Sequence, residues 1–376
     1  MRRLPLLLCA ALSVAAAGNE PDLRGPLGLR TQGSLRELFL DVTAADARAL
    51  SSPELDLRWS LANTWNEPMV LQSYEGRLGQ QLLDEQADAL TFRLRLPWSM
   101  VSRGPPVFGR PLGERITTAL EVRLTEHWGG WSDVPIEGWH SLTGAFNFDR
   151  NQFPRSQVHL VFRDDGGTAF DVQSARLAFG DVVLRNQVLV AEGGAPLWTG
   201  SPSRWGISVR WDLKLPTGLL SRLGGSGGFD TGAALLGSVE LTSWLTAHAL
   251  VSESFFSPLA APTLLQPRTW HSGFDASLEC ALGATTLILE DRVLSSLFGA
   301  GWSRLPRNGD NGLLSSGLFA DFRAHNQVTL ALRRGPFSLW FSEDFTPGAN
   351  AHSTFQYVWE SNAPDVVIGL SYVAHL

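Results

Sequence analysis

The sequence predicts an all-β protein: an antiparallel transmembrane β-barrel of about 12 strands, within a range of roughly 10 to 16 in even numbers, with a short N-terminal segment and one to three short helices. Segments of about ten residues, in which apolar and polar side chains alternate, recur from about residue 53 to the C-terminus. Turn-forming clusters separate them, as in 224–232 and 306–312. After the N-terminal leader, no apolar run reaches the roughly 18 residues that a membrane helix needs.

The alternation is clearest from residue 204 to 216. One parity is apolar and the other carries charge: Ile207, Val209, Trp211, Leu213 and Leu215 against Ser208, Arg210, Asp212 and Lys214. An Arg facing lipid near the bilayer midplane costs about 2–4 kcal/mol, so the charged parity is expected to face a lumen. The same alternation occurs in 54–61, 91–96, 120–125, 239–242 and 328–333.

We expect the charged parity of these strands to line the lumen. The predicted lumen residues are Asp56, Arg58, Arg93, Arg95, Glu121, Arg123, Arg210, Asp212, Lys214, Glu240 and Arg333. A lining of one sign would select ions of the opposite sign, whereas mixed charges brace a narrow barrel across its interior. This set is mixed, so the sequence leaves open both an open pore and a filled, braced lumen.

A soluble exported β-sandwich is the alternative fold, because its strands alternate as well. Two features favour the membrane barrel. The segment 365–376 keeps its apolar residues on one parity to the last residue and resembles the closing strand of outer-membrane barrels, which the insertion machinery recognises. Aromatic side chains occur near the ends of the apolar faces, where an interfacial girdle would place them: Trp59, Trp98, Trp205, Trp211, Trp244 and Trp340.

Residues 1–17 have the pattern of a cleaved signal peptide. Two arginines form the basic region, an apolar stretch follows, and Ala15 and Ala17 suit signal peptidase. A lipid anchor on Cys9 is the alternative, but a leucine precedes that cysteine where a small residue is required. We therefore expect export, cleavage near residue 17 and a location in the bacterial outer membrane.

Residues 18–52 are predicted to form a periplasmic or lumen-entering segment ahead of the barrel, which spans 53–376. A capping pattern at Thr43 predicts a short helix that ends at Leu50. An irregular first strand at 36–42 is the alternative. Two further short helices, which would cap or constrict a pore, are expected at 79–89 and 291–301.

Composition argues against several functional classes. The net charge of −7 provides no basic field for phosphate, so no nucleic-acid partner is expected. Cys280 is the sole cysteine after the leader and the chain has no His-Glu-x-x-His, so neither an intrachain disulfide nor a zinc site is expected. We expect no metal and no cofactor. The expected partners are outer-membrane lipid, lipopolysaccharide and the barrel-insertion machinery.

Two motifs are similar to those of a known family. The N-terminal motif comprises the Gly-Pro-Leu at 25–27 with Arg30 and Gln32, and the central motif comprises Glu137, Gly138, Trp139, His140, Asp149 and Arg150. Together they resemble the bacterial outer-membrane proteins grouped as domain of unknown function 3187, over essentially the whole mature chain. The resemblance implies an outer-membrane location and supplies no known activity. In the central motif, His140 either serves a ligand or pH-sensitive gate or is held structurally by its neighbours.

The expected function is a passive conduit for small solutes, or a structural barrel of the envelope, without enzymatic activity. A lipid or lipopolysaccharide hydrolase of the outer membrane is an alternative, and it requires a Ser and a His in contact. His140, His271 and His352 are each followed directly by Ser, which in a strand places the two side chains on opposite faces. A hydrolase would therefore need Ser and His from different strands. A soluble exported binding protein is the remaining alternative.

Overall fold

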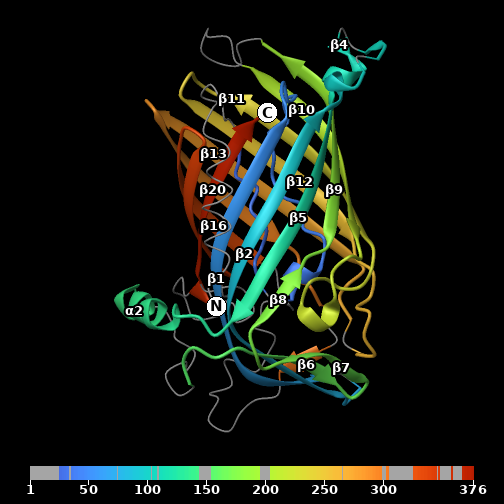
Figure 1. The fold of residues 1–376 in the computed structure, drawn as a ribbon, viewed down its shortest axis with the longest axis vertical. Helices are drawn as coiled ribbons and strands as arrows, with labels where there is room; N and C mark the ends of the chain where they lie inside the picture. Colours follow the sequence, from blue (N-terminus) through green and yellow to red (C-terminus); the bar gives the residue numbers. More distant parts are fainter. Residues whose placement is uncertain are drawn as a thin grey trace.

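A computed structural model describes most of the chain after the predicted signal peptide, and residues 1–17 lie outside the described part. The described strands form a closed antiparallel barrel of 12 strands, as the sequence predicts (Figure 1). The described residues are 25–33, 35–73, 75–102, 104–107, 110–143, 154–194, 204–264, 266–298, 302–304, 325–344, 346–347, 357–358 and 366–376.

The barrel strands follow one another around the wall in chain order. Each is antiparallel to the next, and the last returns to the first, with Leu55 opposite Ala374 and Ala62 opposite Val367. The strands are β1 (Glu54–Ser73), β2 (Leu78–Pro97), β5 (Ile116–Trp128), β9 (Val182–Gly193), β10 (Trp205–Leu215), β11 (Asp230–Glu240), β12 (Leu245–Phe255), β13 (Trp270–Leu282), β14 (Thr285–Leu294), β16 (His325–Arg334), β17 (Phe337–Asp344) and β20 (Val366–His375).

The two ends of the barrel differ in their connections. At one end, here called the short-turn end, β11–β12, β13–β14 and β16–β17 are joined by brief turns, and the C-terminus lies there (top of Figure 1). The opposite, long-loop end carries helix α2 and the far part of the β1–β2 hairpin (bottom of Figure 1). The smaller strands are β3 (Pro106–Val107), β4 (Arg110–Pro111), β6 (His159–Asp164), β7 (Gly167–Val172), β8 (Arg176–Phe179), β15 (Trp302–Arg304), β18 (Thr346–Pro347) and β19 (Tyr357–Val358).

Strand β10 shows how the alternation sorts side chains between the two faces of the wall. Val209 and Trp211 point outward and are 45% and 48% exposed, whereas Arg210 and Lys214 point inward and are buried. A stacked sandwich would bury the apolar parity and expose the charged one. The closed ring with its exposed apolar outer face therefore excludes the sandwich alternative.

Helices are short and differ from those predicted. In the described part of the chain they are η1 (Arg36–Leu38), η2 (Trp98–Met100), η3 (Leu112–Glu114), α2 (Asp133–Thr143) and η5 (Leu220–Arg222). The expected helix at 43–50 is wrong: there the Thr43 carbonyl accepts from Arg210 and the Ala47 carbonyl accepts from Ser208, both on the wall. Among the described residues, no helix combines the length and the apolar character that crossing a bilayer requires.

The two other expected helices do not form in the described residues. Residues 79–89 belong to β2, whose far part pairs with β1 and β6. Leu82 and Leu83 lie on opposite faces there and are both buried, so the alternation is hidden. Residues 291–294 belong to β14. One of the expected girdle aromatics is also misplaced, because Trp340 points inward, is only 2% exposed and lies against Gly369, where an added Cβ would be 2.0 Å from its ring.

Candidate functional site

The lumen is occupied by the N-terminal part of the same chain. Residues 25–33 and 35–50, here called the lumen hairpin, run along the interior, turn at η1 towards the long-loop end and return to the start of β1 (Figure 1). The two arms face each other, with the Thr31 amide donating to Asp41 Oδ2 at 2.8 Å. Gly28 adopts a φ of +58°, and a Cβ there would lie 2.1 Å from the Ala44 carbonyl oxygen, so only glycine allows this approach.

The tip of the lumen hairpin is sealed by an apolar cluster. Phe39 stacks on Phe256 with ring centroids 4.9 Å apart, and Leu38 is fully buried. We call these residues the tip cluster: Leu35, Leu38, Phe39, Leu83, Leu160, Phe162, Phe170, Val172, Leu220, Leu223, Leu259, Leu297 and Phe298. The cluster closes the lumen at the long-loop end with side chains from the hairpin, the wall and the loops.

Above the tip cluster, arginines of the wall bind the hairpin through its backbone. Extended backbone inside a barrel must find partners for its carbonyl groups, because water is excluded there. The wall supplies them: Arg58 donates to Gly28 O at 3.1 Å, Arg185 to Asp41 O at 3.0 Å, Arg210 to Thr43 O at 2.6 Å, Arg292 to Leu29 O at 2.8 Å and Arg333 to Gly25 O at 2.7 Å.

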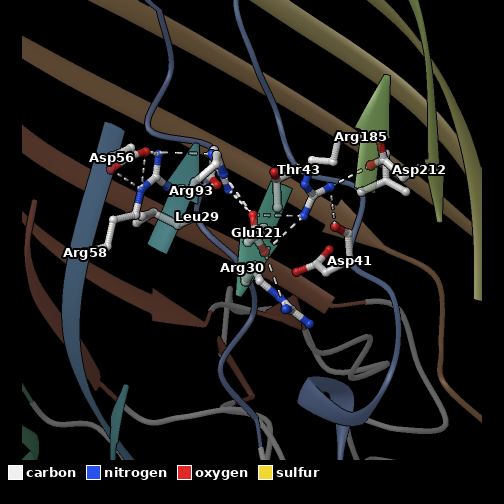
Figure 2. Close-up of polar contacts among 12 residues, drawn as sticks. Leu29, Arg30, Asp41, Thr43, Asp56, Arg58, Arg93, Glu121, Arg185 and Asp212 are labelled. Atoms are coloured by element: carbon white, nitrogen blue, oxygen red, sulfur yellow. Dashed lines mark hydrogen bonds and ion pairs between the residues drawn. The ribbon is translucent and has the colours of Figure 1, made fainter. Parts of the chain in front are cut away.

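Charged side chains of neighbouring strands also pair along the wall (Figure 2). The Glu121 carboxylate accepts a hydrogen bond from Arg93 Nε at 2.8 Å on one side and lies 3.3 Å from Arg185 Nη2 on the other. Arg185 Nη1 donates to Asp212 Oδ2 at 2.6 Å, and Arg93 lies 3.9 Å from Asp56. Buried charges are tolerated only when they are paired, so these contacts brace the wall.

The lumen hairpin contributes charges of both signs to this network. Asp41 forms a two-bond ion pair with Arg292 of β14, and Arg48 Nη1 donates to Glu240 Oε1 at 2.7 Å. The Thr31 amide also donates to the Asp41 carboxylate, so each oxygen of this buried side chain has a partner within the lumen.

The structure places the predicted lumen residues on the inner parity of their strands. Most are buried and paired, and the remaining ones lie near the short-turn end, where Arg95 donates to Glu54 at 2.5 Å. Lys214 donates to Asp181 at 2.5 Å near the opposite end of β10. The full set on the inner parity is Asp56, Arg58, Arg93, Arg95, Glu121, Arg123, Arg210, Asp212, Lys214, Glu240 and Arg333.

The sequence prediction missed several lumen residues, among them Arg185, Arg292 and Asp41. Arg185 and Arg292 follow the alternation of β9 and β14, so extending the same pattern to these strands would have found them. Asp41 gave no local signal, because its partner Arg292 lies 251 positions away along the chain.

The central motif of the sequence analysis lies outside the barrel. Glu137, Gly138, Trp139 and His140 belong to α2, which projects to the side at the long-loop end (lower left of Figure 1), while Asp149 and Arg150 lie outside the described residues. The Trp139 ring contacts Phe341 on the outer face of β17, with centroids 5.9 Å apart. This position on the outside does not suit a gate in a lumen constriction.

The start of α2 is hydrogen-bonded to the barrel wall. These contacts lie at the height where the outer face of the wall changes from apolar to polar. Asn63 follows the outer apolar residues of β1, and its Nδ2 donates to Ser132 Oγ at 2.9 Å and to Asp133 Oδ1 at 3.1 Å. The Gln86 side chain of β2 accepts from the amides of Trp131 and Ser132. The helix thus begins at the boundary between the apolar and polar parts of the outer wall.

In the described part, serine and histidine side chains from different segments meet: Ser52 Oγ lies 2.8 Å from His375 Nδ1, and Ser295 Oγ lies 3.4 Å from His271 Nδ1. His271 points inward and Ser272 outward, as the alternation predicts, and His352 lies outside the described residues. Ser238 Oγ lies 2.7 Å from His248 Nδ1. The same Ser238 oxygen accepts from the Ala47 amide of the lumen hairpin at 2.9 Å, so this pair helps to hold the hairpin.

A pocket lies between the lumen hairpin and the wall, beside Asp41. Its empty volume is about 420 Å³, part of it open to solvent. The residues that line it are Thr31, Arg36, Leu40, Asp41, Val42, Ser252, Ser254, Phe256, His271, Ser272, Gly273, Leu294 and Leu297. Within the described residues, no group of three or more His, Cys, Asp or Glu side chains is arranged to hold a metal ion.

Comparisons with known proteins relate the chain to outer-membrane barrels at the level of fold. No family model and no curated protein matches it. The COG4313 outer membrane channel from Pseudomonas putida F1 is similar with a TM-score of 0.45 and 11% identity, over 89% of this chain and 100% of that chain. The NanC porin has a TM-score of 0.37 and 8% identity, over 86% of this chain and 99% of that chain. The toluene transporter TodX from P. putida has a TM-score of 0.35 and 8% identity, over 87% of this chain and 91% of that chain.

Proposed function

We propose that this chain is an outer-membrane conduit for small solutes that the lumen hairpin holds closed at rest. One observation carries the proposal: the lumen is filled by a segment that precedes the barrel in sequence, while the wall itself keeps a charged inner face. An inner face of this kind suits water and polar solutes once the segment moves. The apolar outer face suits acyl chains and supports the outer-membrane location.

The hairpin is held mainly by polar contacts, which other polar groups can replace. This supports the proposal that the hairpin can be displaced. Its middle part is bound by hydrogen bonds and ion pairs from Arg58, Arg185, Arg210 and Arg292. Each hydrogen bond from a charged guanidinium contributes about 1.5–3 kcal/mol net, because water or a polar solute can replace it. A plug that was purely structural would gain more from apolar side chains of similar volume. The tip cluster is then the main apolar seal that must open.

Planar-bilayer recordings of the refolded full chain test the conduit. We expect long closed periods interrupted by discrete openings, because the closed form dominates. Complete silence at high protein load, in the wild type and in a variant with a loosened hairpin such as Gly28→Ala, would contradict the conduit. Fractionation without detergent tests the location, and recovery of the protein in the soluble fraction would contradict it.

A reversible cross-link tests whether the hairpin is the gate. An added Cβ at Gly232 of β11 would lie 2.6 Å from Val42 Cγ2 of the hairpin, so cysteines at these two positions are close enough to form a disulfide. In a Cys280→Ser background, Val42→Cys with Gly232→Cys should lose its openings when oxidised and regain them with a reductant. Gly232→Cys alone is the control. Equal conductance before and after reduction would show that solutes pass elsewhere.

A further inference from the structure

We infer that helix α2 lies within the lipid leaflet at the long-loop end of the barrel, with one apolar side among the acyl chains. The helix would thereby anchor the long loops at the membrane surface and fix how deeply the barrel sits. The inference rests on the proposed outer-membrane location, and it gives a role to an element that the conduit does not use.

The exposed side of α2 is apolar, which is the reverse of a helix on the surface of a soluble protein. One continuous arc of the helix, at about 100° per residue, carries Val134, Pro135, Gly138, Trp139 and Leu142. All five are exposed, with Val134 at 59%, Trp139 at 40% and Leu142 at 81%. Because water does not suit a contiguous apolar surface, this arc requires an apolar partner.

The two acidic residues of α2 lie away from this arc and are bound by the chain that follows the helix. Asp133 Oδ2 accepts from the Ser156 amide at 2.7 Å, and Arg155 Nε donates to Glu137 Oε1 at 3.0 Å. The carboxylates are therefore held by the protein while the apolar arc faces outward. This is the same arrangement as in the barrel wall, where charge lies inside and apolar side chains lie outside.

Helix α2 lies beside the outer wall, at the edge of the apolar band of that wall (Figure 1). Trp139 contacts Phe341 of β17, with ring centroids 5.9 Å apart. Phe341 lies opposite Leu330 and Ile368 of the neighbouring strands, which point outward and are 51% and 42% exposed. The first turn of the helix is bound instead to Asn63, a polar residue of the outer face. The apolar surface of the wall therefore continues onto the helix at the height where that surface ends.

Acyl chains fit this arc better than a protein partner does. A protein that covered the arc would also have to cover the outer wall beside it, because the two apolar surfaces are continuous. Trp131, which is 54% exposed, adds a second indole at the start of the helix, and tryptophan prefers the membrane interface. An amphipathic helix in the interface plane places its apolar side about 5–10 Å into the boundary between headgroups and acyl chains. Gly138 and Trp139 of the central motif both lie on that side.

Spin labels on the full chain, refolded into phosphatidylcholine vesicles, test the position of α2. In a Cys280→Ser background, a nitroxide at Leu142→Cys is compared in its collisions with oxygen, which enters hydrocarbon, and with a water-soluble nickel chelate. The oxygen-to-nickel ratio should be at least about fivefold higher than at Glu75→Cys, the aqueous reference on the β1–β2 hairpin, and should approach that at Leu235→Cys on the outer wall. Ser141→Cys, about 100° further round the helix, should give a lower ratio than Leu142→Cys.

Two results would overturn the inference while the barrel location stands. A ratio at Leu142→Cys as low as that at Glu75→Cys, with Leu235→Cys in lipid, would place α2 in water beside an inserted barrel. Shielding of the Leu142→Cys label from both reagents would mean that protein, such as a second copy of the chain, covers the arc. If the Leu235→Cys label also collides mainly with nickel, the proposed membrane location fails together with the inference. Heat-modifiable gel migration reports whether each variant is folded, and Val134→Cys provides a second site on the arc.

Discussion

At the scale of single residues, Glu121 shows how the wall carries charge in its interior. Its side chain is 1% exposed and lies between Arg93 and Arg185, with Arg30 of the lumen hairpin 3.5 Å away. Removing a charge from water costs several kcal/mol, and the attraction of close partners offsets that cost only while the set is complete. Each member of this network therefore depends on the others.

Glu121→Gln should destabilise the barrel, because it leaves Arg93 and Arg185 buried without their shared carboxylate. Breaking a buried pair in this way costs about 3–5 kcal/mol. Unfolding by guanidinium in detergent, followed by loss of β-sheet circular dichroism, measures the change. Glu75→Gln is the matched control, because Glu75 is 72% exposed beside Arg77 and a surface pair contributes about 0–1 kcal/mol. Equal effects of the two substitutions would contradict the role given to burial.

At the scale of structural elements, the lumen hairpin and α2 depend on the wall for their conformation. The hairpin arms touch at Gly28 and Ala44, but most backbone partners of the hairpin are side chains of the wall. Helix α2 likewise begins at a position set by Asn63 of β1. Both elements are short, and such segments are marginal without tertiary contacts.

Gly28→Ala should separate the arms of the lumen hairpin and increase the open fraction of the conduit. The added Cβ would be 2.1 Å from the Ala44 carbonyl oxygen, so the backbone must move. Gly76→Ala is a matched control, because Gly76 also has a positive φ, +80°, yet has no atom within 4 Å of the added Cβ. Single-channel recording measures the open fraction, and the prediction fails if the two variants open equally often.

Asn63→Ala should release the first turn of α2 from the wall, because both hydrogen bonds of its Nδ2 are lost. Amide hydrogen exchange in residues 132–138 should accelerate by roughly tenfold, the equivalent of about 1.4 kcal/mol in the opening equilibrium. Mass spectrometry of peptic fragments measures the exchange. Asn186→Ala is the control, since Asn186 accepts from Thr118 elsewhere on the outer wall. Unchanged exchange in 132–138 would mean that other contacts hold the helix.

At the scale of the whole molecule, the wall separates two environments. Outward apolar residues surround the barrel, and inward charges surround the hairpin, so each strand has one face for each medium. The connections β11–β12, β13–β14 and β16–β17 at the short-turn end are as brief as the periplasmic turns of outer-membrane barrels, while the β2–β5 connection at that end carries η2, β3, β4 and η3. The effect of a substitution on insertion should therefore depend on the face of the strand that carries it and on its height along the strand.

Leu235→Arg, at the middle of β11, should impair insertion much more than Leu282→Arg, beside the turn at the short-turn end. Both leucines point outward and are similarly exposed, at 53% and 58%. Arginine costs about 2–4 kcal/mol at the bilayer midplane and about 0–1 kcal/mol near the interface. Refolding yield into lipid vesicles, read from heat-modifiable gel migration, measures the difference. Similar yields for both variants would contradict a lipid-facing outer wall.

The sequence by itself determined the class of fold and the face of most strand residues. In β10, for example, the alternation alone assigns Val209 to the outside and Arg210 to the inside, because successive strand side chains point to opposite faces. This rule is local, so it needs no knowledge of the partner strands. The rule works wherever each face of a strand meets a single medium. The alternation is hidden in the far part of β2, where both faces are covered.

Only the tertiary structure decided what fills the lumen. The lumen hairpin has no alternation of its own, and its carbonyls are satisfied by Arg58, Arg210 and Arg292, which lie far away along the chain. For the same reason the predicted helix at 43–50 does not form, and Trp340 packs inward against Gly369. Contacts between distant segments leave no periodic trace in the sequence, and it is these contacts that turn a charged, open-looking barrel into a closed one.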